Sequence, residues 1–183
     1  MEEKTLHRRD YLSTLDEEKL NDFLETVAPY IFIIIEFNSL EAMLDFCIKE
    51  LMSDSEGRDD MVFVFLAEMS YSSKVTCLMN LYGQYNFGCD LKLNQQLINL
   101  ETHLREAAKR RNQYAHGQWD DTSEDNYLTV KVKAKRDGVF HVYRKFEVSD
   151  MEADLEYIQN TQSLLDDFDE EMKERLNRST PPV

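Results

Sequence analysis

The feature that most constrains the fold is an apolar pattern of helical spacing between about Leu91 and Ala115. Residues three or four apart fall on the same side of an α-helix, and a helix with one apolar side buries that side against other helices. The positions that set the pattern are Leu97, Leu100, Leu104, Ala107 and Ala108. Gly117 follows, and glycine is common just past a helix end. The segment therefore predicts a long amphipathic helix within a helix bundle.

A charged residue continues this apolar side. Arg111 comes 11 residues after Leu100 and 7 after Leu104, which places it within about 20° of both around the helix axis. Asn112 and His116 are four residues apart and share the adjacent side. A guanidinium, an amide and an imidazole are therefore expected to gather where this helix ends.

Four further segments have helical periodicity. They run from the capping box Thr14-x-x-Glu17 to Pro29, over 30–52, from Asp59 or Asp60 through Met69 to Tyr82, and from Ser149 or Asp150 past Met172. Pro29 is expected to break or kink the first of these. The third is apolar almost all round between Met61 and Ala67, which indicates a central helix or one at a dimer interface.

Alternating residues between Tyr127 and Val148 predict a β-hairpin, with Asp137-Gly138 at its turn. A three-residue loop, 136–138, gathers the apolar residues on one face; it would set Ala134 opposite Phe140, Val132 opposite Val142 and Leu128 opposite Phe146. An isolated hairpin is marginally stable in water, so the apolar face is expected to dock on the helices.

The fold class predicted is mainly all-α. We expect one domain over 1–183, an antiparallel bundle of four or five helices with the hairpin (127–148) inserted before the last helix. An N-terminal arm (1–13), a polar loop with Trp119 (118–126) and a disordered tail (178–183) complete it.

Composition indicates a soluble cytoplasmic protein. Three cysteines are an odd number, which favours reduced thiols in a reducing compartment. The N-terminus does not resemble a signal peptide, and the longest apolar run, Val27 to Ile35, is too short to span a bilayer. We therefore expect no membrane association.

Charge is segregated along the chain. The net charge is −15, which disfavours nucleic acid as a partner. The segment from Arg105 to Lys145, however, contains ten Lys/Arg and six Asp/Glu, so its net charge is +4 and that of the rest of the chain is −19. This segment is either a basic surface for RNA or an ordinary mixed surface.

Two sequence segments resemble those of a known family. Arg111-Asn112-x3-His116 resembles the signature of HEPN domains, which are small helical bundles. Met69-Ser70-Tyr71-Ser72-Ser73-Lys74-Val75 is similar to the Ser/Thr-aromatic-x-x-Lys segment of their second core helix. The resemblance covers about Asp16 to Arg175. It implies a metal-independent endoribonuclease that leaves a 2′,3′-cyclic phosphate, in which Arg111 clamps the phosphate, His116 transfers protons and Asn112 orients the pair.

The chemistry of these residue types fits RNA cleavage. Histidine exchanges protons near neutral pH, and arginine offers a planar fork that matches phosphate oxygens. RNA carries its own 2′-hydroxyl nucleophile, so no activated serine or metal-bound water is needed. One His116 cannot readily act at both ends of an in-line displacement, whereas a homodimer through the motif helices would supply two. No nucleotide or metal motif is present, so neither a cofactor nor a metal is expected.

Other residues are assigned supporting roles. RNA contacts are expected from Lys109, Arg110, Tyr114, Lys131 and Lys133, and Glu36 is expected to pair with Arg111 or Arg105. Several of these roles have an alternative. Tyr114 would be an ordinary core tyrosine, and Glu36 would lie solvated at the rim. The hairpin lysines would keep an exposed hairpin soluble, and Trp119 would stack on a base.

Three functional hypotheses follow. The first is a ribonuclease (an endonuclease and hydrolase) of the toxin–antitoxin or antiviral-defence kind, with a possible antitoxin protein as a partner. The second is a non-catalytic HEPN module that binds nucleotide, RNA or a protein. The third is a structural helical dimer, in which Arg111 pins the helix end to Glu36 and His116 caps the last carbonyls.

Overall fold

The computed structural model covers the whole chain and describes residues 17–53, 59–85, 90–116, 118–120, 128–135, 138–145 and 147–179. The helices are α2 (Glu17–Met52), α3 (Asp59–Ala67), α4 (Tyr71–Tyr85), α5 (Leu91–Ala115) and α6 (Val148–Ser179); the strands are β1 (Gln118–Asp120), β2 (Leu128–Lys135) and β3 (Gly138–Lys145). The mainly helical fold is confirmed. The expected arm, 1–13, lies outside the described residues, and α6 continues to Ser179 into the segment assigned to the tail.

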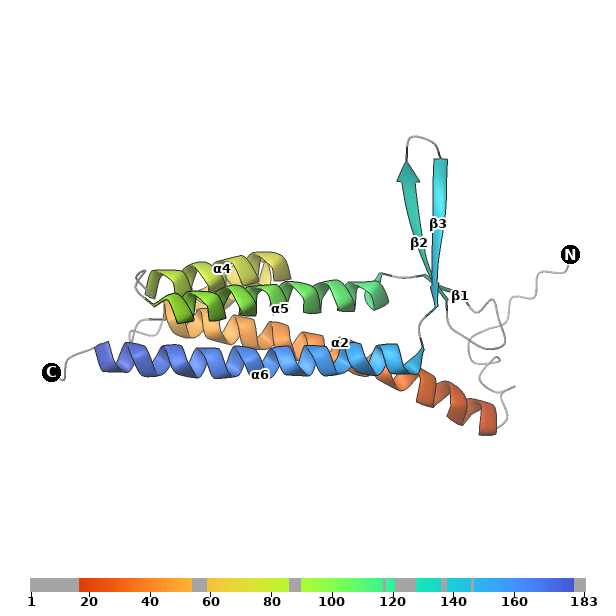
Figure 1. Cartoon of the computed structure of the whole chain (residues 1–183), viewed down its shortest axis with the longest axis horizontal. Helices are drawn as coiled ribbons and strands as arrows, with labels where there is room; N and C mark the ends of the chain where they lie inside the picture. Colours follow the sequence, from red (N-terminus) through yellow and green to blue (C-terminus); the bar gives the residue numbers. More distant parts are fainter. Residues whose placement is uncertain are drawn as a thin grey trace, which may run out of the picture.

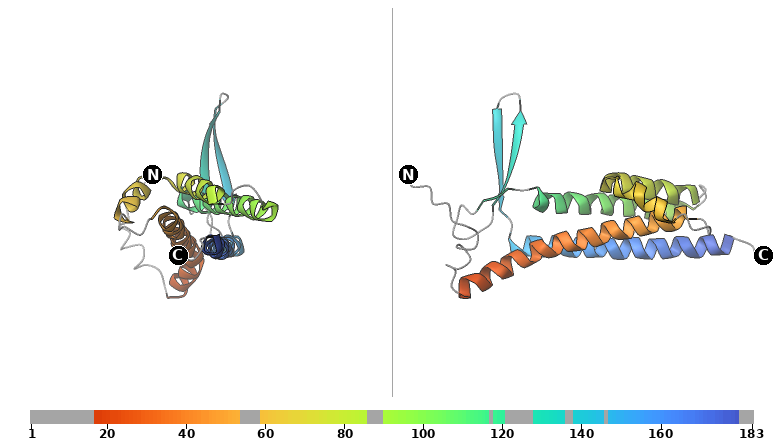
Figure 2. Two further views of the ribbon diagram at one scale, coloured as in Figure 1. Left: turned by 90° about the vertical axis from the view of Figure 1, so that its left-hand side faces the viewer. Right: turned by 180° about the vertical axis from the view of Figure 1, so that it is seen from behind.

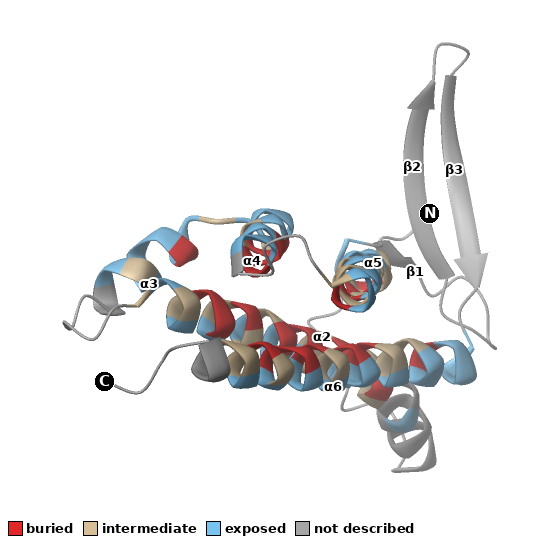
Figure 3. Cartoon of the chain, turned by 60° about the vertical axis from the view of Figure 1, so that its left-hand side comes forward, coloured by how far each residue is buried: buried red, intermediate tan, exposed pale blue. Residues whose placement is uncertain are grey.

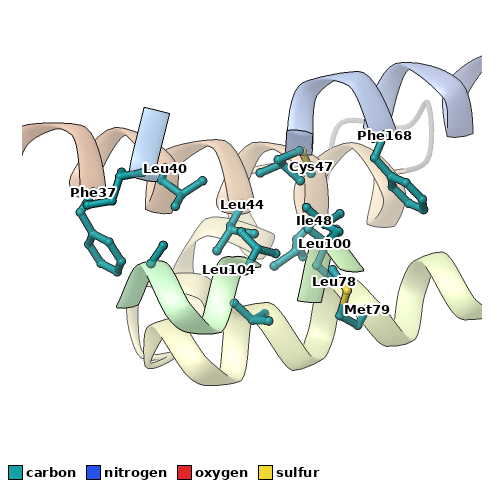
Figure 4. Packing of buried hydrophobic residues seen from close by; sticks show 14 of the residues in the cluster. Phe37, Leu40, Leu44, Cys47, Ile48, Leu78, Met79, Leu100, Leu104 and Phe168 are labelled. Carbon is teal, nitrogen blue, oxygen red and sulfur yellow. The ribbon is translucent and has the colours of Figure 1, made fainter. Parts of the chain in front are cut away.

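Four helices form the bundle, with α2 and α6 side by side and α4 and α5 across them (Figure 1; Figure 2). The predicted apolar side of α5 is confirmed, because Leu100, Leu104 and Ala107 are fully buried. Figure 4 shows Leu40, Leu44 and Ile48 of α2 meeting Leu78 and Met79 of α4 and the two leucines of α5. This shared apolar core fixes where each end of α5 lies.

The helix directions differ from the all-antiparallel prediction. The Gln162 side-chain amide of α6 donates to Glu36 of α2, and Lys173, later in α6, pairs with Glu50, later in α2. Because the residue numbers increase in the same direction on both helices, α2 and α6 run parallel. Of the four helices of the bundle, only α5 runs in the opposite direction to α2 (Figure 1). Short connections normally join antiparallel neighbours. Here α3 lies between α2 and α4 in the sequence and carries the chain back, so that α4 runs in the same direction as α2.

Pro29 does not break the first long helix. α2 is continuous from Glu17 to Met52 with Pro29 inside it, so the prediction of two separate helical runs is wrong. A proline costs one hydrogen bond and bends a helix. Figure 1 shows the first turns of α2 leaning away from α6. Burial of the following apolar residues, such as Ile33 and Phe37, holds the helix together beyond that point.

The helix predicted from Asp59 to Tyr82 is instead two helices, because Ser70 starts a new one. The Ser73 amide donates to Ser70 Oγ at 3.2 Å, and the Lys74 amide donates to the Ser70 carbonyl at 3.0 Å. A serine that accepts from the amide three residues on is an N-cap. Of the two positions predicted for Met61–Ala67, the central one is wrong, because most of α3 is exposed (Figure 3), and the position at a dimer interface stays a prediction.

The strands differ from the prediction in pairing and in place. They form a three-stranded antiparallel sheet in the order β1-β2-β3, and β1 includes Trp119, which was expected in a loop. Lys135 pairs with Gly138 and Ala134 with Val139, so the predicted register is wrong by one residue. That register assumed a face buried on the helices, but β2 and β3 project away from them (Figure 1). Alternation fixes a register only where one face of the strands is known to pack on a core.

Candidate functional site

The C-terminal end of α5 presents the predicted amide and imidazole to solvent. Asn112 and His116 are both exposed in its last turn. The backbone amide of His116 donates to the Asn112 carbonyl at 3.2 Å and closes the helix. The backbone of His116 therefore caps the helix, whereas the structural hypothesis assigned this cap to the imidazole.

The Arg111 guanidinium is held against an aromatic ring. Its Cζ lies 4.3 Å from the centroid of Phe37, a fully buried residue of α2. One Nη donates to Asn112 Oδ1 at 3.0 Å, and Nε has no hydrogen-bond partner among the described residues. Stacking fixes the plane of a guanidinium, and the Nε atom of Arg111 is buried. Arg111 and Asn112 thus form one polar unit beside His116.

The expected partner of Arg111 is engaged elsewhere. Gln162 donates to Glu36 Oε2 at 3.0 Å and to the Glu36 carbonyl at 2.8 Å. The prediction that Glu36 pairs with Arg111 or Arg105 is therefore wrong, because Glu36 is on the side of α2 that faces α6. Arg105 instead pairs with Glu101 at 2.7 Å and donates to Ser72 and Thr76 of α4.

Arg110 and Tyr114 turn toward α6 and do not face solvent as RNA contacts would. Arg110 Nη1 lies 2.6 Å from Asp154 Oδ1, and its guanidinium stacks on the Tyr157 ring at 3.9 Å. Tyr114 is fully buried and donates to Asp154 Oδ2 at 2.6 Å. The stacking role predicted for Tyr114 is wrong; its alternative as a core tyrosine holds. Its place seven residues after Ala107, on the same apolar side, was a usable sequence signal.

Asp154 therefore anchors the end of α5 to α6. Replacing it with alanine leaves the buried Tyr114 hydroxyl without its acceptor and Arg110 without its nearest carboxylate. We expect Asp154→Ala to lower the free energy of unfolding by about 2 kcal/mol. Denaturant unfolding followed by circular dichroism measures this. Glu152→Ala, an exposed acid on the same helix, is the control and should change stability by less than about 0.5 kcal/mol.

The second sequence segment meets the first at Phe37. Tyr71, at the start of α4, packs its ring on Phe37 at 4.6 Å and donates its hydroxyl to the Leu104 carbonyl of α5 at 3.2 Å. Burial, and then the Glu41 carboxylate, raise the pKa of Tyr71 well above its ordinary value despite the nearby Arg111 and Arg105. The phenol is therefore a neutral donor that ties α4 to α5. Sequence patterns gave no signal for Phe37 as the residue between the two segments.

The remaining predicted RNA contacts lie further out. Lys109 is exposed and pairs with Glu106 at 2.9 Å. Lys131 and Lys133 belong to β2, but their side chains lie outside the described part of the chain. The structure thus places Arg111, Asn112 and His116 in the last turns of α5, where the one side-chain hydrogen bond described among them joins Arg111 to Asn112.

The described residues form neither a metal cluster nor a membrane span. Within the described ranges, no three His, Cys, Asp or Glu side chains are grouped so as to hold a metal ion. No described helix is long and apolar enough to cross a membrane. Comparison of the chain with protein-family models, with curated proteins and with solved structures finds no match.

Proposed function

We propose that the chain is a HEPN-type, metal-independent endoribonuclease, of the toxin or defence kind, whose site is the exposed end of α5. Arg111 binds the scissile phosphate, His116 transfers protons and Asn112 holds the Arg111 guanidinium by the bond at 3.0 Å. RNA supplies the attacking 2′-hydroxyl, and the products carry a 2′,3′-cyclic phosphate and a 5′-hydroxyl.

One observation carries the proposal. Four arginines have described side chains, and three of them pair with carboxylates: Arg105 with Glu101, Arg110 with Asp154, and Arg175 with Asp90 and Glu171. Among these four, Arg111 alone has no carboxylate oxygen within 4.0 Å in the described part of the chain. In a chain of net charge −15, an arginine without an acidic partner beside exposed Asn112 and His116 is suited to an anionic ligand.

A second copy supplies the second proton carrier. Cleavage needs one group to deprotonate the 2′-hydroxyl and another to protonate the leaving 5′-oxygen on the opposite side of phosphorus. Twofold contact between two α5 ends would place two imidazoles and two guanidiniums around one phosphate. The exposed positions of Asn112 and His116 favour such a contact, because no described segment covers them.

The test is cleavage of a labelled RNA in the presence of a chelator. We expect wild-type protein to release fragments with a 2′,3′-cyclic phosphate and to leave the 2′-deoxy analogue intact. Loss of a charge-stabilising donor commonly costs about 10²–10³ in rate, so we expect Arg111→Ala to slow cleavage by that factor. Lys92→Ala, which removes an exposed cation near the other end of α5, is the matched control and should retain activity within a few-fold. Intact RNA with the wild-type protein contradicts the proposal.

A non-catalytic module is the second candidate, and the charge distribution favours it. The outer side of α6 carries Asp166, Asp167 and Glu170, all exposed, and such a surface repels RNA away from the α5 end. This candidate predicts binding of a nucleotide or short RNA that Arg111→Ala weakens, with no product formed. Fluorescence anisotropy with a labelled oligonucleotide in the same samples distinguishes the two.

A further inference from the structure

A large exposed apolar surface lies on α2 and α3, away from the α5 end. Nine of the twelve large hydrophobic side chains that are exposed in the described part of the chain belong to these two helices, with exposures of 44% to 68%. They are Ile31, Phe32, Ile35, Phe46, Met52, Met61, Phe63, Val64 and Phe65. We call this set the α2/α3 face.

The size of the α2/α3 face exceeds what a monomer ordinarily exposes. An aromatic side chain has roughly 150–250 Å² to bury and an aliphatic one somewhat less, so nine side chains that are 44% to 68% exposed present on the order of 800 Å². A typical monomer's largest apolar patch is about 300–600 Å², whereas each partner in a standard protein interface buries about 800 Å². The surface is therefore large enough for a stable contact.

The outer side of α2 has a regular pattern. Ile31, Ile35, Ala42 and Phe46 recur at helical spacing on the side opposite the buried Phe37. Seven residues after Ala42, Lys49 lies 5.4 Å from the Phe63 ring, so α3 begins where this stripe ends. Exposed Asn38 and Ser39 occupy its middle.

This stripe lacks charge although the chain is strongly acidic. The three acids of α2 between Ile31 and Phe46 are all held by other helices: Glu36 by Gln162, and Glu41 and Asp45 by Lys74. A net charge of −15 opposes contact between two copies through most surfaces. The stripe is a place where two copies can meet without bringing carboxylates together.

The stripe is also complementary to itself when two copies run antiparallel. A twofold axis between Asn38 and Ser39 sets Ile31 opposite the partner's Phe46 and Ile35 opposite the partner's Ala42. Ile35 then faces a small residue near the axis, which allows the helices to approach at the usual 8–10 Å, and Ile31 packs against Phe46 at each end of the contact. From size, neutrality and complementarity we propose that the α2/α3 face is a self-association surface, on which a second copy of this chain docks with its α2 antiparallel to the first.

This contact is separate from the one proposed at the α5 end. The stripe is on the side of α2 away from Phe37, on which Arg111 stacks, so docking leaves Asn112 and His116 uncovered. If the α2/α3 contact is the only one, its loss halves the mass of a dimer; a chain that uses both contacts assembles beyond a dimer and falls to a dimer when this contact is lost. The proposal therefore does not rest on RNA cleavage, and its failure is distinguishable from failure of the proposed function.

The test is the molar mass in solution, measured by light scattering during size-exclusion chromatography across a dilution series. We expect Ile35→Glu to halve the mass of the wild-type particle, because it places a carboxylate against the partner's Ala42. Ile98→Glu is the matched control, since Ile98 is equally exposed but belongs to α5, and should leave the mass unchanged. A monomeric wild-type protein, or a mass that Ile35→Glu does not alter, overturns the proposal.

A cross-linking experiment tests the same geometry without disturbing the apolar contact. Ser39 is exposed and near the proposed axis, so Ser39→Cys should give a covalent dimer with a short bismaleimide reagent. Thr102→Cys, on the exposed side of α5, should give no more dimer than wild-type protein treated in the same way, which accounts for the native cysteines. Equal yields from the two variants overturn the antiparallel arrangement.

Discussion

RNA cleavage by the His116→Ala protein is expected to be about 10²–10⁴-fold slower than by the wild-type protein, the usual contribution of a positioned acid or base. In a composite site one substitution removes both imidazoles, so the loss should fall near the upper end of this range. His116 is exposed and its side chain makes no contact that the structure describes. The change should therefore leave the thermal midpoint within about 2 °C.

A matched histidine separates chemistry from general effects. His103 is on the same helix, three turns earlier, and stacks on Tyr157 at 5.2 Å instead of facing the α5 end. His103→Ala should retain cleavage within a few-fold once any loss of stability is taken into account. A substrate with a 5′-thio leaving group, which departs without a proton, should be cleaved by His116→Ala with a smaller deficit. Undiminished cleavage of ordinary RNA by His116→Ala would contradict the assigned role.

The helices and the α5 site follow from side-chain periodicity, which is a local property. The apolar side of α5 fixes the rotation of that helix, so the sequence predicts that Arg111 continues the buried side and that Asn112 and His116 share the adjacent side. Leu100 and Leu104 are buried as expected, and Arg111 does lie against α2. The pattern did not determine which α2 residue Arg111 contacts: its guanidinium stacks on Phe37, whereas Glu36 was expected as its partner.

The errors arise where a long-range contact decides between local options. Glu36 is half-buried, as expected, but Gln162 of α6 reaches it, and a partner 126 residues away leaves no trace in the sequence. The apolar run of α3 is compatible with a central helix or with one at a dimer interface, and composition alone does not distinguish the two. The strand register depended on a buried face, and the sheet extends away from the helices.

Lys74→Met is expected to lower the free energy of unfolding by about 3 kcal/mol, the lower end of the cost of removing one partner from a buried ion pair. Lys74 is 5% exposed and lies between two carboxylates of α2, at 3.0 Å from Glu41 and 2.8 Å from Asp45. Both carboxylates keep about a quarter of their side-chain surface in contact with water, which moderates the loss. Lys109→Met is the exposed control and should change stability by less than about 0.5 kcal/mol.

The pH dependence of this loss tests whether it comes from charge or from packing. Burial alone would lower the pKa of Lys74, but the hydrogen bonds to Asp45 and Glu41 outweigh it and hold the pKa above the ordinary value of 10.5. A cation whose pKa is raised by folding stabilises the protein fully below its unfolded pKa, and that stabilisation is lost as the pH rises through the folded pKa. The difference in unfolding free energy between wild type and Lys74→Met should therefore be constant from neutral pH to about pH 10 and shrink above it. Denaturant titrations of both proteins across this range measure it. A difference that persists undiminished at the highest pH would assign the loss to packing of the lysine stem, and the two carboxylates would then have no part in joining α2 to α4.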